Sequence, residues 1–233
     1  MLFTKIGIML SFIPFVFSFQ TLLFNETNLF VIRGPITETL ADDFVKSMII
    51  DKPEYIYIYS NGGSVIAGNR IVMQLINKNV TCVAERAYSM AFVILQACKH
   101  RYITPTATAM QHQQSIGHLS GDLASISGYL NMVHAMEQYL TEMQSTRIGI
   151  SEEKLRTLSS VEWWMFGEDI IYHNVADEIV QVDCTIELVK KNTTVVKRSF
   201  FGDVTEIYSG CPLLHTPISE IDNDNTCTNA KLK

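Results

Sequence analysis

Short apolar runs recur through the middle of the chain, and several of them end at a Gly or Ser residue. Residues 29–34 (LFVIRG) and 54–60 (EYIYIYS) are β-branched and aromatic runs of the kind that form strands. Residues 80–85 predict a short buried strand, and residues 101–105 and 107–112 predict two further strands.

Segments with helical spacing of apolar residues separate these runs. Helices are predicted over residues 37–49, 65–79, 89–98, 123–146 and 150–159, and residues 169–180 predict a helix that runs into a strand. The segment 89–98 is apolar nearly all round, which is typical of a deeply buried helix. Strands that alternate with helices indicate an α/β core with largely parallel pairing.

The two ends of the chain differ from this alternating core. Residues 1–18 begin with a weak positive charge at Lys5, continue as a short apolar run and end at Ser18, which is typical of a secretory signal peptide. An uncleaved N-terminal anchor is the alternative. Residues 184–200 predict two strands around a turn, and residues 219–233 predict a loose polar tail.

Composition bounds the class of protein. The chain has 233 residues, of which 47% are hydrophobic, so one globular domain with a substantial core is expected. Its formal net charge of −6 argues against nucleic acid as the main partner, because phosphate binding needs a basic face.

Three Asn-x-Ser/Thr triplets, at Asn25, Asn79 and Asn192, agree with a secretory route and are possible glycosylation sites. If the chain follows that route, its location is the secretory pathway or the exterior, or a membrane where the N-terminal segment is not cleaved.

Five cysteines occur without a C-x-x-C pair, so a zinc site is not expected. Cys82 starts a predicted strand and Cys98 ends the helix after it, which places both on the same side of a βα unit, near enough to bridge. Cys184, Cys211 and Cys227 allow three pairings, among which the sequence does not choose.

Two strand-to-helix junctions, "YSNGGSV" and "AYSMAF", are the candidate chemical centre, because ligands of α/β sheets gather where strands end and helices begin. Together they offer backbone amides at Gly63 and Met90 and a hydroxyl at Ser89, which is the layout of an oxyanion hole with a nucleophile. The alternative for Ser89 is an ordinary helix N-cap. Of six histidines, His112 is the favoured base, because it ends a predicted strand on the same side of the sheet.

These pieces, in the order "IYIYSNGGSVIAGNRI", "AYSMAFVIL", "RYITPTATAMQHQ" and "VADEIV", resemble the Clp protease proteolytic subunit, a serine peptidase family of the crotonase-like superfamily. The resemblance covers residues 29–182. It implies an α/β fold of repeated ββα units with a long handle helix at residues 123–146, to which this chain adds a small C-terminal extension.

The resemblance also assigns roles to residues. Ser89 matches the nucleophile, His112 the base, and Gly63 and Met90 the backbone donors of the oxyanion hole. Glu162 stands where the family usually has the aspartate that orients the base, with Asp169 as an alternative carboxylate. Further departures are Ala91 and Asn61, where the family usually has a glycine and a proline.

The domain organisation that follows is a signal peptide or anchor over residues 1–18, a Clp-protease-like catalytic domain over 19–183, and a cysteine-containing, partly disordered extension over 184–233. The resemblance implies an endopeptidase acting on peptides or unfolded protein, with no metal or organic cofactor.

It also implies a homo-oligomer of two stacked heptameric rings and an unfoldase ATPase as partner. A secretory compartment is a poor place for an ATP-driven partner, so that partner is doubtful. Two rival interpretations stay open: a ring-forming scaffold or binding protein that lacks activity, and a membrane-associated peptidase with a Ser-Lys pair.

Overall fold

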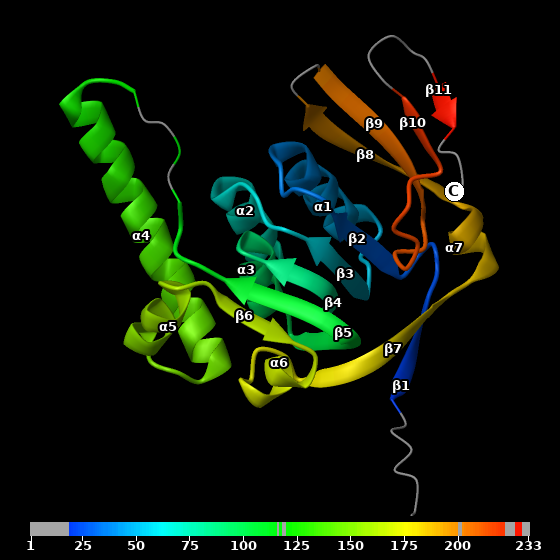
Figure 1. The fold of residues 1–233 in the computed structure, drawn as a ribbon, viewed down its shortest axis with the longest axis horizontal. Coiled ribbons are helices and arrows are strands. Elements are labelled where there is room, and N and C mark those ends of the chain that lie inside the picture. The colour runs from blue at the N-terminus through cyan, green and yellow to red at the C-terminus, as the bar shows by residue number, and fades with distance from the viewer. Residues whose placement is uncertain (1–18, 116, 118–119, 200–201, 222–226, 230–233) are drawn as a thin grey trace, which may run out of the picture.

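A computed structural model describes residues 19–115, 117, 120–199, 202–221 and 227–229, and residues 1–18, with the predicted signal peptide, lie outside this part of the chain. The fold is mixed α/β with a mostly parallel sheet and several helices, as predicted (Figure 1). The first half of the chain forms β1 (Gln20–Phe24), β2 (Leu29–Arg33), α1 (Glu38–Ile50), β3 (Tyr55–Ser60), α2 (Val65–Leu75), β4 (Thr81–Tyr88), α3 (Met90–Ala97) and β5 (His100–Gln111). The second half forms α4 (Leu123–Ile148), α5 (Glu152–Ser159), β6 (Trp163–Phe166), α6 (Glu168–Tyr172), β7 (Glu178–Cys184), α7 (Ile186–Lys190), β8 (Asn192–Ser199), β9 (Gly202–Ser209), β10 (Ser219–Ile221) and β11 (Cys227–Asn229).

The main sheet has seven strands in the order β1-β7-β5-β4-β3-β2, with β6 paired to β5. Every pairing along that order is parallel, and only β6 runs antiparallel, against β5. Strands β1 and β6 were not predicted, because each is only four or five residues long and lacks a clear apolar alternation.

The two strands predicted over residues 101–105 and 107–112 are a single strand, β5. Pro105 suggested a break between them, because proline cannot donate a ladder hydrogen bond. The register of β5 against β4 jumps at this point, from Ala84 opposite Ile103 to Arg86 opposite Thr108. This irregularity lets the strand continue past the proline.

Helices α1, α2 and α3 pack on one face of the sheet and enclose the main core, and α3 is buried along nearly its whole length, as its composition predicts. Thr37 and Ser64 cap α1 and α2 through their side-chain oxygens. Helix α2 ends at Leu75 rather than at residue 79, and the chain leaves the helix through Asn77, whose φ is 64°.

A buried arginine ties the segment between α6 and β7 to the sheet. The Arg101 side chain is 2% exposed, and its Nη2 donates to Asp177 Oδ1 over 2.5 Å. Burial alone would raise the pKa of the Asp177 carboxyl, but the hydrogen bonds and charge of Arg101, with the charge of Arg147, lower it below its ordinary value.

The described residues of the C-terminal extension form a short helix and a second sheet. Within the segment predicted as two strands, the described residues form α7 and β8, because Thr185 caps a short helix by accepting from Leu188 N. The described part of the polar tail contains β10 and β11, which complete an antiparallel sheet of order β11-β10-β9-β8. Figure 1 shows this second sheet above the end of the main sheet that is farthest from α4.

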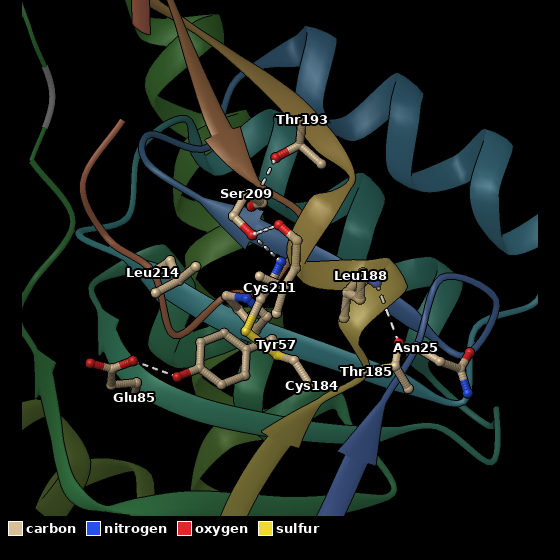
Figure 2. Close-up of a disulfide and its surroundings, with 12 residues drawn as sticks. Asn25, Tyr57, Glu85, Cys184, Thr185, Leu188, Thr193, Ser209, Cys211 and Leu214 are labelled. Atoms are coloured by element: carbon tan, nitrogen blue, oxygen red, sulfur yellow. Dashed lines mark hydrogen bonds between the residues drawn. A yellow bond between two sulfur atoms is a disulfide. The ribbon is translucent and has the colours of Figure 1, made fainter. Parts of the chain in front are cut away.

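A disulfide between Cys184 and Cys211 anchors this extension, so one of the three open pairings is now identified (Figure 2). Beside it, the Tyr57 hydroxyl donates to Glu85. Burial is the larger cause that raises the pKa of Tyr57, and the hydrogen bond to Glu85 is the second. Arg33 adds a second anchor, because its guanidinium donates to the carbonyls of Leu214 over 2.8 Å and Pro212 over 3.1 Å.

The predicted bridge between Cys82 and Cys98 is confirmed, with the two Cα atoms 5.9 Å apart. The three sequon asparagines differ in environment: Asn79 and Asn192 are exposed, whereas Asn25 is half-buried and its Oδ1 accepts from the Thr27 and Asn28 amides. Among the helices of the described ranges, none is both long and apolar enough to cross a bilayer.

Candidate active site

The two junctions singled out in the sequence lie side by side, because β3 and β4 are neighbours with Ser60 opposite Ala87. Gly62 touches the second junction directly: a Cβ atom there would lie 2.7 Å from Tyr88 O and 2.8 Å from Ser89 Cβ. Gly63 has φ 152°, and a Cβ atom on it would collide with Ile36 O at 2.5 Å. Only the paired glycines allow the loops to approach this closely.

Ser89 occupies the N-cap position of α3, yet its side chain makes no capping hydrogen bond. Its backbone has φ 55° and ψ −122°, a conformation that side-chain-bearing residues rarely adopt. The Ser89 amide donates to Met110 O over 2.8 Å, which fixes this turn against β5. The hydroxyl is therefore turned away from the helix end and left for another partner.

That partner is His112, whose Nε2 lies 2.8 Å from Ser89 Oγ. His112 follows the last residue of β5, so the same strand fixes the Ser89 turn and carries the imidazole. Among the other described histidines, His134 lines the same cavity, with its Nδ1 3.8 Å from Glu137 Oε2. His215 pairs with Glu85 and stacks on Tyr59. His118 lies outside the described residues.

The two backbone N–H groups proposed as oxyanion donors belong to Gly63 and Met90. Within the described ranges, neither the Gly63 nor the Met90 N–H has a hydrogen-bond acceptor. Met90 is the first residue of α3, so its N–H has no partner inside the helix. Both residues line one cavity together with Ser89 and His112.

Glu162 directly precedes β6, the strand that pairs with the end of β5. The β5–β6 register ends at Gln111 opposite Trp163, so its extension places Glu162 opposite His112. Glu162 has φ 57° and is exposed, and its Oε2 accepts from the Trp164 indole N–H over 3.1 Å. No hydrogen bond between Glu162 and His112 occurs in the described part of the chain, and Asp169 is exposed in the first turn of α6.

The cavity beside Ser89 has a volume of about 520 Å³ and is bounded by α4 and α5 on its outer side. Val93, Val133 and Leu140 form part of an apolar wall. Glu137 and Arg156 form an ion pair of 2.5 Å on another wall. A cavity of this size, with both apolar and charged walls, can hold a side chain of a bound peptide next to the Ser89 hydroxyl.

Two buried polar residues of this cavity, Gln111 and Gln144, were not predicted from the sequence. They hydrogen-bond each other over 2.5 Å. A glutamine within an apolar strand was the one available signal, and it does not identify a partner 33 positions away. The described residues contain no group of three or more His, Cys, Asp or Glu side chains that could hold a metal ion.

Known proteins resemble this chain in sequence. The family profile for Clp protease matches residues 16–183. The ATP-dependent Clp protease proteolytic subunit of Borreliella afzelii is 26% identical in an alignment of 175 residues that covers 71% of this chain and 88% of that protein. The ATP-dependent Clp protease proteolytic subunit 2 of Pseudomonas aeruginosa is 23% identical over 167 residues, 67% of this chain and 83% of that protein. Because the family profile spans most of the sequence, including both junctions and His112, this chain belongs to the Clp protease family.

Proposed function

We propose that this protein is a serine-type endopeptidase that hydrolyses peptides or unfolded protein, with Ser89 as nucleophile and His112 as base. The single observation that carries the proposal is the 2.8 Å contact between Ser89 Oγ and His112 Nε2, made by a serine whose hydroxyl does not cap its helix. A hydroxyl bonded to an imidazole, on a strained strand-to-helix turn, is the arrangement that activates serine nucleophiles.

The reaction follows from the positions of these groups. Ser89 Oγ attacks the peptide carbonyl carbon while His112 Nε2 takes the hydroxyl proton. The N–H groups of Gly63 and Met90 bind the oxyanion, and one such donor is typically worth about 10²–10³ in rate. The intermediate collapses, the amine leaves with the proton from His112, and a water molecule then hydrolyses the acyl-enzyme by the same steps.

We assign Glu162 the role of orienting the imidazole and stabilising its cation. The β5–β6 pairing ends at Gln111 opposite Trp163, one residue before His112 and one residue after Glu162, which supports the assignment. Its carboxylate would have to leave the Trp164 indole and turn to His112 Nδ1. Glutamate is one methylene longer than aspartate, and Ser-His-Glu triads exist on other folds.

The assembly and the location belong to the same proposal. Exposed apolar side chains on α4, including Tyr129 and Met132, favour a homo-oligomer, which the family resemblance would make a pair of stacked rings. Two disulfides favour an oxidising compartment, hence the secretory pathway or the exterior. The relatives are ATP-dependent by name. An ATPase partner does not follow for a protein in a compartment without that energy source.

The test is covalent labelling of the purified, folded protein with a fluorophosphonate probe. Labelling should occur on Ser89 and vanish in Ser89→Ala. The matched control is Ser115→Ala, because Ser115 lines the same cavity but has no base within hydrogen-bond distance in the described structure. Glu162→Gln should slow labelling by about tenfold or more, whereas Asp169→Asn should not.

Labelling that persists in Ser89→Ala would contradict the assignment of the nucleophile. Absence of labelling in wild-type protein that is folded and assembled would favour the second candidate, a ring-forming scaffold without activity. The observation that favours this candidate is the Glu162 carboxylate bound to Trp164 instead of His112.

A further inference from the structure

Two buried glutamines connect His112 to the interior face of α4. Gln111 is 6% exposed and Gln144 is 4% exposed. Gln111 Nε2 donates to Gln144 Oε1 over 2.5 Å, and Gln144 Nε2 donates to Leu140 O over 2.9 Å. The chain of bonds therefore begins one residue before the base and ends on the backbone of the long helix.

The other end of this chain is the main chain of His112. Pairing between β5 and β6 ends at Gln111, so the His112 N–H has no ladder partner. It donates instead to Gln111 Oε1 over 3.2 Å. Gln111 thus uses both ends of its amide, one toward His112 and one toward Gln144.

The imidazole has few other constraints. Its Nε2 contacts Ser89 Oγ, and in the described part of the chain its Nδ1 has no hydrogen-bond partner. The next residue is held by one bond, from Gln113 N to Ser159 O over 3.1 Å. The place of the ring relative to Ser89 consequently depends on how the backbone at 111–113 is fixed.

A buried pair of glutamines is less favourable in free energy than apolar side chains in the same positions. Burying each amide costs free energy unless its oxygen and nitrogen are both bonded, and long side chains lose rotamer freedom. An apolar residue of similar volume would pack in either position without that cost. What the amides add is direction: two specific bonds fix one geometry where apolar contacts would permit several.

We propose that Gln111 and Gln144 are positioning residues that hold His112 at the distance from Ser89 that proton transfer requires. Neither touches the reacting atoms. They act through the His112 main chain, and α4 is the anchor. This inference rests on the proposed serine-peptidase function and deepens it, because it makes the placement of the base depend on where α4 packs.

The test measures fluorophosphonate labelling of Gln111→Met, Gln144→Met and the double variant, resolved into the maximal rate constant and the half-saturating probe concentration. A displaced base should lower the maximal rate constant by about tenfold or more, since small misplacements of reacting groups cost up to about 10²-fold. The half-saturating probe concentration should stay within about twofold of wild type, because methionine is similar in volume to glutamine and leaves the size of the cavity unchanged. The double variant should lose no more than the worse single variant, as expected of residues that act as a unit.

The matched control is Gln96→Met. Gln96 is also a buried glutamine, 2% exposed, and it donates to Val175 O over 3.0 Å at the other end of α3. It should lower the thermal stability without changing the maximal rate constant. Equal loss of rate in Gln96→Met and Gln144→Met would show a general effect of destabilisation and overturn the proposal, as would wild-type rates in folded Gln111→Met and Gln144→Met.

A second measurement needs no variant. Amide hydrogen exchange of the wild-type protein should show a protected His112 N–H, and an unprotected one in labelling-competent protein would overturn the proposal even where the variants do not fold. These results distinguish failure of the proposed function from failure of this inference. Wild-type protein that is never labelled would contradict the proposed function. Labelled wild type with unaffected glutamine variants would contradict only the positioning role of Gln111 and Gln144.

Discussion

Ser89 illustrates how much a single position depends on its surroundings. The residue sits where an N-cap belongs, and in sequence a capping serine and a nucleophilic serine look alike. The difference lies in a φ of 55° and in the bond to His112, both of which follow from contact with β5 and the glycine loop. With this backbone conformation, the Ser89 hydroxyl contacts the His112 imidazole instead of capping the helix.

Asp177 is a residue whose importance lies in stability. Replacing it by Asn removes the charge opposite Arg101, which is 2% exposed, while keeping the shape. We expect a loss of roughly 2–3 kcal/mol in the free energy of unfolding at neutral pH, less than the about 3–5 kcal/mol for a fully buried pair. The reduction reflects the Asp177 side chain, which is 34% exposed. Urea unfolding measures the difference.

The difference in unfolding free energy between wild type and Asp177→Asn should depend on pH. The pKa of Asp177 is lowered in the folded state, so its stabilisation is complete above the ordinary aspartate pKa of about 3.9 and disappears as the pH falls through the folded value. The stabilities of wild type and Asp177→Asn should therefore begin to converge as the pH falls below about 3.9, and they should meet only below the lowered folded-state pKa. Asp169→Asn is the control for the removal of one exposed carboxylate. A gap between wild type and Asp177→Asn that persists in acid would contradict the role of charge.

At the scale of elements, the unit that presents Ser89 is β4 followed by α3. The strand starts at Thr81, the helix ends at Ala97, and the disulfide between Cys82 and Cys98 closes the base of this unit, opposite the Ser89 turn. Both cysteines are almost fully buried. The cross-link restrains the unfolded chain and keeps the two elements together.

The double variant Cys82→Ala/Cys98→Ala should lose roughly 3 kcal/mol of unfolding free energy under oxidising conditions, the amount expected for a closed loop of about 15 residues. Chemical denaturation measures the loss. In fully reduced protein the double variant and wild type should differ by much less. A difference that is equally large after reduction would assign the effect to packing of the sulfur atoms rather than to the cross-link.

For the whole molecule, α4 is the feature that a monomer leaves unexplained. The helix extends away from the sheet (Figure 1), and its buried residues begin only at Val133. Its first ten residues expose apolar side chains, among them Leu123 at 88% and Met132 at 44%. A short helical stretch without tertiary support is marginal in water, so a partner surface is expected.

Light scattering coupled to size-exclusion chromatography should accordingly give a mass that is a multiple of the mass of one purified chain, which is 26.3 kDa for all 233 residues. Tyr129→Ser/Met132→Ser should shift that mass toward the monomer, because it removes two exposed apolar side chains of α4. Asn131→Ala, which changes an exposed polar residue between them, should leave the mass unchanged. A monomeric wild-type protein would contradict the expected assembly.

Sequence patterns determined a large part of this protein. The period of apolar residues identified β2, β3, β4 and helices α1 to α5, since burial of one face imposes that period wherever an element packs on a core. The order of Gly63, Ser89 and His112 identified the family. The pairing of Cys82 with Cys98 followed from βα topology alone, because both ends of the unit must lie at one edge of the sheet.

Only the tertiary structure decided how these pieces meet. It showed β1, β6 and the second sheet, whose weak local patterns are overridden by pairing with distant strands. It separated Ser89 from an ordinary cap, placed Glu162 against Trp164, and joined Gln111 to Gln144 across 33 positions. Periodicity records which face of an element is buried. The direction of a hydroxyl, a carboxylate or an amide depends on atoms that the fold brings from elsewhere in the chain.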